Sequence, residues 1–262
     1  MTVKALVLRA PGTNCDVETS WALEAAGADP QRVHVNALLR GEVSLDEFGI
    51  VVFPGGFSFG DDIASGKVLA NRLVYRLREQ LDNYLSLGRP IVGICNGFQV
   101  LVKAGLLPGT AGPWDGTPTV TLTDNDSGRF ECRWVYLKTT SKKSFWVKSL
   151  PDVFPIPVAH GEGKFVALNH SVYKQLEKNG QVLFRYVDDR GRKAGYPANP
   201  NGSMGDVAGI TNGAGNILGL MPHPERTSFP FQNAQWTRQK PSKDGVGLRL
   251  FKNAVRYAAQ VN

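Results

Sequence analysis

The clearest chemical feature of this sequence is a cysteine that stands between two glycines. Gly93 and Gly97 flank Cys95 with one residue on each side, directly after the apolar run 90–94. This order is typical of a nucleophile elbow, a sharp turn from a strand into a helix that projects its central side chain at the edge of a sheet. The N-terminus of such a helix favours negative charge, and hence the thiolate that attacks carbonyl carbon. We interpret Cys95 as the nucleophile; the alternative is a buried cysteine in a glycine-rich turn.

A thiolate that cleaves an amide also needs a proton shuttle, and His223 is suited to that role. It follows the predicted strand 216–221, and Glu225 stands two positions later in a segment that Pro222 and Pro224 hold extended. Alternate side chains of an extended segment point the same way, so Glu225 is placed to accept a hydrogen bond from the imidazole and stabilise the imidazolium. An isolated His-Pro-Glu would be an ordinary surface turn, but its position after a sheet strand favours a catalytic pair.

The glycine-rich segment 54–62 offers backbone donors at the same sheet edge, because it directly follows the predicted strand 50–53. Attack on an amide creates a negative oxygen that needs N–H donors, and glycines let backbone N–H groups face a ligand without interference from a side chain. We predict that Gly55 and Gly56 lie at the substrate, and that the amides of Gly56 and Asn96 form the oxyanion hole.

Two other interpretations of this segment are weaker. A phosphate-binding loop would end in lysine followed by serine or threonine, and this segment does not. Asp61 and Asp62 are of a type that binds metal ions, but two adjacent loop carboxylates without further ligands are more often solvated. We therefore predict no metal site and no cofactor in this chain.

The remaining histidines are less suited to catalysis. His34 lies within a predicted strand, and His170 opens a helical pattern. His160 is the one serious rival to His223, because it stands in a glycine-rich loop with Glu162 two positions later.

The remaining cysteines are also less suited to it. Cys132 falls on the aromatic face of an alternating strand, so we expect it in the core. Cys15 follows a predicted strand, as a nucleophile of this fold does. However, we expect the carboxylates of Asp16 and Glu18 to raise the pKa of Cys15 and disfavour its thiolate.

Strand and helix patterns alternate through the first 104 residues. Apolar runs predict strands, amphipathic stretches predict helices, and glycine or proline ends most of them. The alternation is typical of a parallel sheet that helices cover on both faces. The predicted strands are 3–8, 32–36, 50–53 and 90–94, and the predicted helices are 17–26, 64–87 and 98–104.

After residue 105 the pattern becomes antiparallel. Phe130, Cys132, Trp134 and Tyr136 alternate with charged residues, which predicts a strand whose aromatic face is buried. The fold class that we expect is α/β, with a mostly parallel central sheet, helices on both faces and an antiparallel β extension. Further strands are predicted at 181–187, 207–211 and 216–221, and a last helix at 247–259.

Composition excludes several classes of protein. The 262 residues are 42% hydrophobic and 20% charged, as in ordinary globular proteins, and no apolar run approaches the roughly 18 residues of a membrane span. The three cysteines argue against a disulfide framework and for a reducing compartment, so we expect a cytoplasmic protein. The net charge of +7 can attract acidic partners, but the basic stretch 138–148 lacks a nucleic-acid-binding motif around it. We expect neither nucleic acid nor a membrane as a partner.

Together these motifs resemble those of the triad-type (class I) glutamine amidotransferases. The resemblance rests on Gly-Ile-Cys-Asn-Gly-Phe-Gln at 93–99 and His-Pro-Glu at 223–225. Further segments narrow it to the glutaminase subunits of phosphoribosylformylglycinamidine synthases. These are APGTNCD at 10–16, PGGFSFGDD at 54–62, HGEG at 160–163, NPNGS at 199–203 and MPHPER at 221–226.

The resemblance implies a flavodoxin-like glutamine amidotransferase domain that spans residues 1–262. It implies hydrolysis of L-glutamine to glutamate and ammonia through a thioester on Cys95, with His223 as general base and acid, Glu225 as its orienting partner and Gln99 in contact with the substrate. It also implies a synthetase partner that uses ATP and Mg. With the ammonia, that partner converts formylglycinamide ribonucleotide to formylglycinamidine ribonucleotide in de novo purine biosynthesis, often together with a small third subunit.

Two other functions stay open from the residues alone. One is a cysteine hydrolase that uses the same elbow on another amide or ester, and the other is a non-catalytic, basic α/β module that binds a nucleotide. The stretches 140–155 and 227–243 are longer than in the compact form of this subunit, which leaves the partner interface open. The pattern assigns no role to His160, Glu162 or Asn201.

Overall fold

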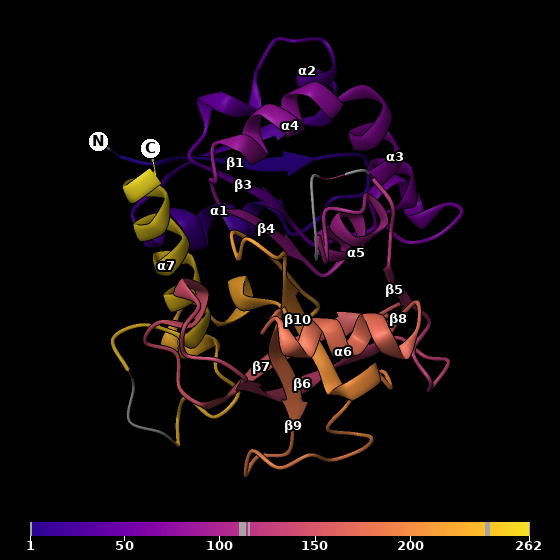
Figure 1. Ribbon diagram of the computed structural model, residues 1–262. Helices are drawn as coiled ribbons and strands as arrows, with labels where there is room; N and C mark the ends of the chain where they lie inside the picture. The colour runs from indigo at the N-terminus through magenta and orange to yellow at the C-terminus, as the bar shows by residue number, and fades with distance from the viewer. Residues whose placement is uncertain (1, 110–113, 115, 239–241, 262) are drawn as a thin grey trace.

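A nine-stranded sheet forms the centre of the computed structural model, which describes residues 2–109, 114, 116–238 and 242–261. The strand order is β2-β1-β3-β4-β11-β10-β9-β6-β7, and a separate pair is formed by β5 and β8. The predicted α/β class is confirmed (Figure 1). The strands are β1 (Lys4–Arg9), β2 (Asp29–His34), β3 (Ile50–Phe53), β4 (Ile91–Ile94), β5 (Val120–Thr123), β6 (Glu131–Thr139), β7 (Val153–His160), β8 (Lys164–Ala167), β9 (Val182–Val187), β10 (Val207–Thr211) and β11 (Ile217–Leu220).

Five neighbouring strands, from β2 to β11, run parallel to one another. Strands β3, β4 and β11 are buried at every residue, as expected of parallel strands that are covered on both faces. Parallel strands end at one edge of a sheet. The chain continues at that edge into Gly55 after β3, Cys95 after β4 and His223 after β11. The sheet therefore brings together the three segments that the sequence singled out.

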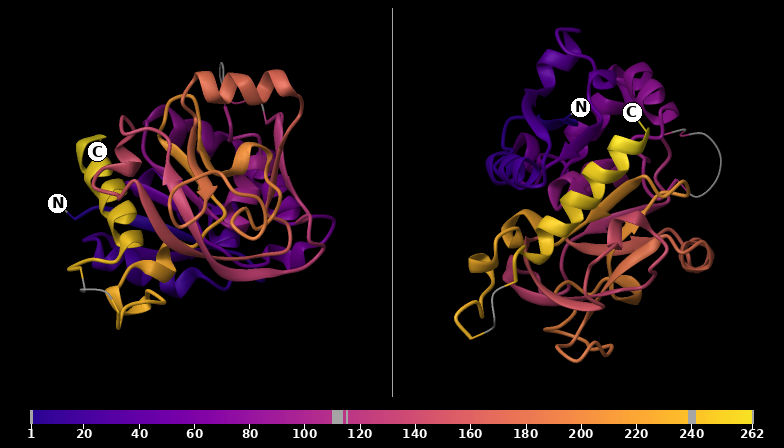
Figure 2. Two further views of the ribbon diagram at one scale, coloured as in Figure 1. Left: turned by 90° about the horizontal axis from the view of Figure 1, so that it is seen from below. Right: turned by 90° about the vertical axis from the view of Figure 1, so that its left-hand side faces the viewer.

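Helices cover both faces of this parallel half. On one face, α5 contacts β3, β4 and α3, and on the other, α7 contacts α1 and β3 (Figures 1 and 2). Helix α5 is buried at seven of its eight residues, among them the polar Asn96 and Gln99. The helices are α1 (Asp16–Ala25), α2 (Val35–Leu39), α3 (Lys67–Arg76), α4 (Arg78–Ser86), α5 (Asn96–Lys103), α6 (His170–Lys178) and α7 (Val246–Val261).

The antiparallel half of the sheet continues from β11 through β10, β9, β6 and β7. Strand β7 ends at His160, so the loop 161–163 leaves the sheet beside the elbow, where its Glu162 contacts side chains of α5. The antiparallel extension predicted from the sequence is thus one wall of the candidate active site.

Two elements of the first half differ from the prediction. The helix predicted over 64–87 is two helices, α3 and α4, because Leu77 leaves the helical conformation at φ −119° while its side chain stays buried. The four-residue spacing of leucines survives the break, which is why the sequence suggested one helix. The strand predicted at 32–36 begins at Asp29 and ends at His34, whose Nδ1 caps the short helix α2 by accepting the N–H of Asn36 at 3.2 Å.

The face of β6 that is buried is the opposite of the one predicted. The alternation is present, but Val135 and Leu137 face the core, and Cys132 is exposed rather than buried. Phe130, just before the strand, is 53% exposed. The large aromatic residues suggested a core face, whereas the smaller aliphatic residues on the other face, Val135 and Leu137, are the ones that pack in the core.

The longer stretch 140–155 packs against the last helix. Trp146 is completely buried, and the ring of Phe145 stacks on Tyr257 of α7 at 3.9 Å between centroids. Asn253 of α7 donates to the carbonyls of Trp146 and Lys148 at 3.0 and 2.7 Å. Of the other long stretch, 227–243, residues 239–241 lie outside the described residues. Among the described residues, none of the helices is both long and apolar enough to cross a membrane.

Close packing of α5 on the sheet predicts a stability cost for any side chain at Gly97. A Cβ there would overlap the carbonyl oxygen of Phe53, whereas a Cβ at Gly195 would meet no atom within 4 Å. Overpacking of this kind costs about 1–3 kcal/mol. We expect Gly97→Ala to lower the free energy of unfolding by at least this amount and Gly195→Ala to leave it nearly unchanged, as measured by urea denaturation. Equal stability of the two variants would contradict the packing.

Candidate active site

The elbow holds Cys95 in a strained conformation. Its backbone has φ 50° and ψ −107°, which is unusual for a residue other than glycine, and α5 begins at the next residue. The Cys95 N–H donates to the carbonyl of Leu220 in β11 at 2.8 Å, and its side chain is buried. The thiol donates to the carbonyl of Ala159, the penultimate residue of β7, at 3.5 Å. Strand β11 and the antiparallel half thus fix the predicted nucleophile from two sides.

His223 and Glu225 form a buried pair. The His223 N–H donates to the carbonyl of Pro157 at 2.9 Å, which ties the segment to β7. Its Nδ1 lies 2.5 Å from Oε1 of Glu225, and both side chains are about 1% exposed. Because a carboxylate accepts, Nδ1 carries the proton in this hydrogen bond, and Nε2 is the nitrogen left for exchange with a substrate or a thiol.

The imidazole of His223 is placed to hold a proton. Burial alone would lower the pKa of His223, but the negative charge of Glu225 and the nearby groups of Cys95 and Cys15 outweigh it and raise the pKa well above 6.5. Within the described chain, Nε2 is buried and lacks a partner with good hydrogen-bond geometry. The two groups that the sequence proposed as nucleophile and acid are therefore brought together, with the imidazolium favoured.

The backbone amides predicted for the oxyanion hole are available. In the residues that the structure describes, the N–H groups of Gly56 and Asn96 donate to no other backbone or side-chain group. The Asn96 side chain is used structurally, since its Oδ1 accepts the N–H of Ser58 at 3.1 Å and its Nδ2 donates to Asp61 and Gln99, each at 3.0 Å. Asn96 therefore ties the glycine-rich loop to the elbow while leaving its own N–H open.

Gly55 and Gln99, both predicted to lie at the substrate, make hydrogen bonds within the protein. The carbonyl of Gly55 accepts the N–H groups of Asn14 and Cys15 at 3.4 and 3.1 Å, so its backbone supports the neighbouring loop. Gln99, expected to contact substrate, is buried, and its Nε2 donates to the carbonyl of Glu162 at 2.6 Å. In this structure its amide links α5 to the loop 161–163.

Glu162 closes that loop onto the opposite wall of the site. Its carboxylate accepts the Ser65 hydroxyl at 2.6 Å and lies 3.7 Å from the Lys103 ammonium. No sequence signal pointed to Ser65 or Lys103, because both lie outside the motifs at 54–62 and 93–99. Asp61 belongs to the same group and burial raises its pKa, while Asp62 is exposed.

His160 is not a second proton shuttle. It is 2% exposed, with Nδ1 3.1 Å from Oδ1 of Asn125 and Nε2 3.5 Å from Nδ2 of Asn201. Burial, together with the nearby His223, lowers the pKa of His160 to about 3, so its imidazole stays neutral. Asn201 also donates to the carbonyl of Gly163 at 2.8 Å. The histidine and the asparagines thus form a neutral, buried network under the loop 161–163.

Cys15 lies beside His223, which the sequence did not predict. Its pKa is raised, as expected, but burial is the main cause and Glu225 a further one, rather than Asp16 or Glu18. Cys15, His223 and Glu225 resemble a set of metal ligands, with ligand atoms all within 4.8 Å of one another. However, the guanidinium of Arg226 donates to Sγ of Cys15 at 3.2 Å, and a cation next to a cation is unfavourable.

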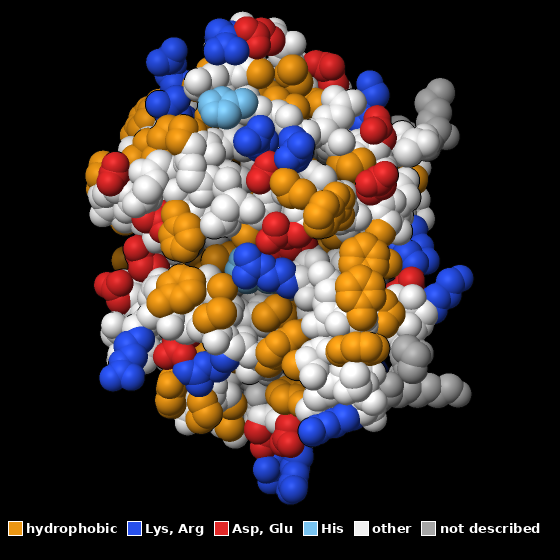
Figure 3. Space-filling view, turned by 180° about the vertical axis from the view of Figure 1, so that it is seen from behind, with side chains coloured by type: hydrophobic (Ala, Val, Ile, Leu, Met, Phe, Trp, Pro, Cys, Tyr) orange, Lys and Arg blue, Asp and Glu red, His pale blue; other side chains and the backbone are white. Residues whose placement is uncertain are grey.

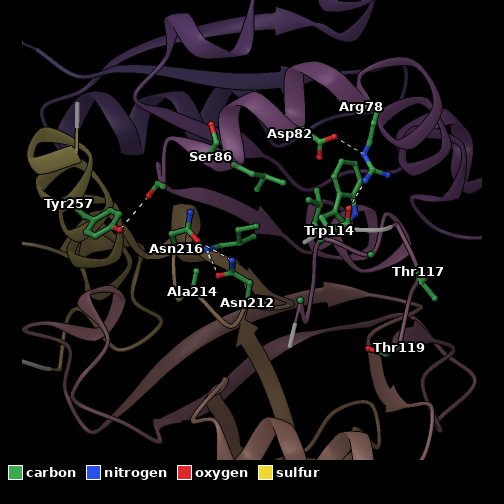
Figure 4. Close-up of a pocket in the computed structure, with 16 residues that line it drawn as sticks. Arg78, Asp82, Ser86, Trp114, Thr117, Thr119, Asn212, Ala214, Asn216 and Tyr257 are labelled. Atoms are coloured by element: carbon green, nitrogen blue, oxygen red, sulfur yellow. Dashed lines mark hydrogen bonds and ion pairs between the residues drawn. The ribbon is translucent and has the colours of Figure 1, made fainter. Parts of the chain in front are cut away.

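A cavity of about 730 Å³ lies away from these residues (Figure 4). Ile217, the first residue of β11, lines it, so it opens at the edge of the sheet opposite the elbow. Two pairs of polar side chains in its wall are bonded to each other: Arg78 pairs with Asp82 at 2.9 Å, and Asn212 donates to Asn216 at 2.9 Å. The cavity is therefore separate from the candidate active site.

Comparison with known proteins identifies the family. A sequence profile described as the CobB/CobQ-like glutamine amidotransferase domain matches residues 2–258. The chain belongs to this family. It is a glutamine amidotransferase, which confirms the resemblance drawn from the elbow and the His-Pro-Glu segment.

Several relatives of this amidotransferase carry the same name. Proteins named phosphoribosylformylglycinamidine synthase subunit PurQ are 45% identical in Dehalococcoides mccartyi, over 99% of both chains, and 42% identical in Archaeoglobus fulgidus, over 97% of both chains. A solved structure of PurLQS from Thermotoga maritima matches with a TM-score of 0.73 and 30% identity, over 98% of this chain and 99% of that one. The structure of a putative GMP synthase protein from Thermoplasma acidophilum shares the fold, at 15% identity and a TM-score of 0.59 over 99% of this chain and 96% of that one.

The contact between Glu225 and His223 leads to a prediction for the pKa of His223. Because the negative charge of Glu225 raises the pKa of His223, we expect a clearly lower pKa of His223 in the Glu225→Gln variant. The imidazolium then loses its proton earlier as pH rises. NMR titration of the His223 ring measures this directly, and Glu42→Gln, which removes an exposed carboxylate paired with Arg40, is the control. An unchanged His223 titration in Glu225→Gln would contradict the assignment.

Proposed function

We propose that this amidotransferase is the glutaminase subunit of a phosphoribosylformylglycinamidine synthase. It hydrolyses L-glutamine to glutamate and ammonia, with Cys95 as nucleophile, His223 as general acid and base, and Glu225 as the group that orients the imidazole. The observation that carries the catalytic assignment is the convergence of the Cys95 elbow and the buried His223–Glu225 pair at one sheet edge. The PurQ relatives, similar over nearly the whole chain, support the assignment of the subunit.

The first half of the reaction forms a thioester. The Cys95 thiolate attacks the side-chain amide carbon of glutamine, and the N–H groups of Gly56 and Asn96 donate to the negative oxygen of the tetrahedral intermediate. One such donor contributes on the order of 10²–10³ in rate. His223 then gives its Nε2 proton to the departing nitrogen, the C–N bond breaks and ammonia leaves, with the γ-glutamyl group bound to the sulfur of Cys95.

The second half hydrolyses the thioester. Nε2 of His223, now without its proton, takes one from a water molecule as the oxygen attacks the thioester carbon. The C–S bond breaks, glutamate leaves, and the thiolate and imidazolium are restored. Glu225 stabilises the imidazolium whenever it forms, without itself taking the proton. The neutral His160 adds no competing positive charge beside it.

The ammonia serves a partner. We propose that the chain acts as one glutamine amidotransferase domain over residues 1–262 and assembles with a synthetase subunit, which the similarity to the PurLQS structure supports. That partner, in this proposal, binds ATP and Mg. A small third subunit is part of this proposal. No cofactor is assigned to this chain itself. We place the complex in the cytoplasm, since all three cysteines are free.

Replacing the nucleophile tests the function. In the complex assembled with its synthetase partner, Cys95→Ser should lose glutamine-dependent product formation by at least ~10³-fold, since a serine hydroxyl is a weak nucleophile here. Synthesis from ammonium salts should remain at the wild-type rate. The matched control is Cys132→Ser, at an exposed cysteine in β6. Glutamine use that survives in Cys95→Ser would refute the mechanism.

A further inference from the structure

The thiol of Cys15 has no part in the proposed reaction, yet it lies next to the group that moves the proton. Its side chain is about 1% exposed. Its sulfur, an imidazole nitrogen of His223 and a carboxylate oxygen of Glu225 all lie within 4.8 Å of one another. Cys15 therefore lies beside the imidazole that works with Cys95 in the proposed reaction, and that reaction assigns Cys15 no role.

Three contacts fix the sulfur of Cys15 in place. The Cys15 N–H donates to the carbonyl of Gly55 at 3.1 Å, which anchors the backbone to the end of β3. The thiol donates to Oδ1 of Asn14 at 3.1 Å, and the sulfur accepts from Nη2 of Arg226 at 3.2 Å. Arg226 is in turn held by Glu18 of α1 at 3.3 Å. The sulfur is thus oriented by both a donor and an acceptor.

Gly55 completes the surroundings of the ring. A Cβ at this position would lie 2.9 Å from Cε1 of His223 and 3.0 Å from Sγ of Cys15. The absence of a side chain at Gly55 therefore leaves room for both the Cys15 thiol and the Cε1 edge of the imidazole at the end of β3. Glu225 holds the Nδ1 side of the ring at 2.5 Å. The ring is restrained on these sides, and Nε2 is left for Cys95 and the substrate.

We propose that Cys15 is a positioning residue: its sulfur packs against the imidazole of His223 and keeps Nε2 directed at Cys95 and the leaving nitrogen. The proposal rests on the function proposed above. Burial keeps the Cys15 thiol protonated by raising its pKa. A neutral thiol restrains the ring without taking the proton that His223 must give to the leaving nitrogen.

Cys15→Ala in the complex with the synthetase tests this role. We expect kcat for glutamine hydrolysis to fall by about 10- to 100-fold, since small misplacements of a catalytic group have effects of this size. KM for glutamine should stay within about twofold, and ammonia-dependent synthesis should be unchanged, because Cys15 is assigned no contact with either substrate. Cys15→Ser, which keeps a small group able to donate and accept, should restore most of kcat.

The pH profile separates positioning from a merely structural effect. The active form carries a proton on His223, so activity is lost at high pH as that proton leaves. Because contact with Cys15 helps to raise the pKa of His223, Cys15→Ala should move this basic limb to lower pH. Cys132→Ala removes an exposed thiol and should match the wild type in kcat and in the pH dependence of activity. If Cys15→Ala does not fold, Asn14→Ala, at an exposed position that holds the thiol, should show a smaller loss of kcat in the same direction.

The proposal is overturned if Cys15→Ala keeps the wild-type kcat and basic limb. It is also overturned if the loss vanishes once kcat is expressed per site titrated with a glutamine-mimicking electrophile, since only folding would then have changed. If Cys15→Ala does not fold, unchanged kinetics in Asn14→Ala overturn it. Failure of the proposed function is a different result: the wild-type complex would then form no product from glutamine, or Cys95→Ser would remain active.

Discussion

The position of the Cys95 thiol depends on how closely helix α5 packs against the ends of β3 and β4. Gly97 has its backbone against the Phe53 carbonyl, and Gly93 has its backbone against the first turn of α5. Only with glycine at both positions can the chain turn sharply enough to place Cys95 at φ 50°. The thiol then stands at the carboxyl edge of the sheet, where the loops after β3 and β11 also end.

The second constraint is the balance of charge inside a buried site. Four groups that can ionise, Cys15, Cys95, His223 and Glu225, lie together with little access to water. A buried imidazolium is costly unless it is paired, and the carboxylate 2.5 Å away provides the pair. The neighbouring groups are kept neutral, since burial raises the pKa of Cys15 and lowers that of His160. Of the two buried histidines, His223 alone therefore carries a positive charge, next to the carboxylate that stabilises it.

The face of the molecule seen from behind in Figure 3 carries exposed hydrophobic side chains on both sides of its centre. Phe57, in the glycine-rich loop, and Phe130, before β6, are exposed, and their rings lie 6.3 Å apart. Both come from segments that border the elbow, so the candidate active site and these apolar side chains share one region of the surface.

Much of the site was predictable because its residues stand directly after apolar strands. Cys95, Gly56 and His223 each follow a run that is fully buried in the structure, and a parallel sheet brings such positions together without further information. Residues that act through contacts distant in sequence were not predictable. Ser65 meets Glu162 across 97 positions, and Cys15 meets Arg226 across 211. The prediction of which face of β6 is buried was also wrong, because alternation alone does not say which face meets the core.

The central claim is that Cys95, and not the neighbouring Cys15, forms the covalent intermediate. Rapid acid quenching of the assembled complex during turnover of glutamine, followed by peptide mass spectrometry, tests it most directly. The account predicts a γ-glutamyl group on the peptide that contains Cys95 and none on the peptide that contains Cys15. A γ-glutamyl group on Cys15, or steady turnover with Cys95 unmodified throughout, would contradict it.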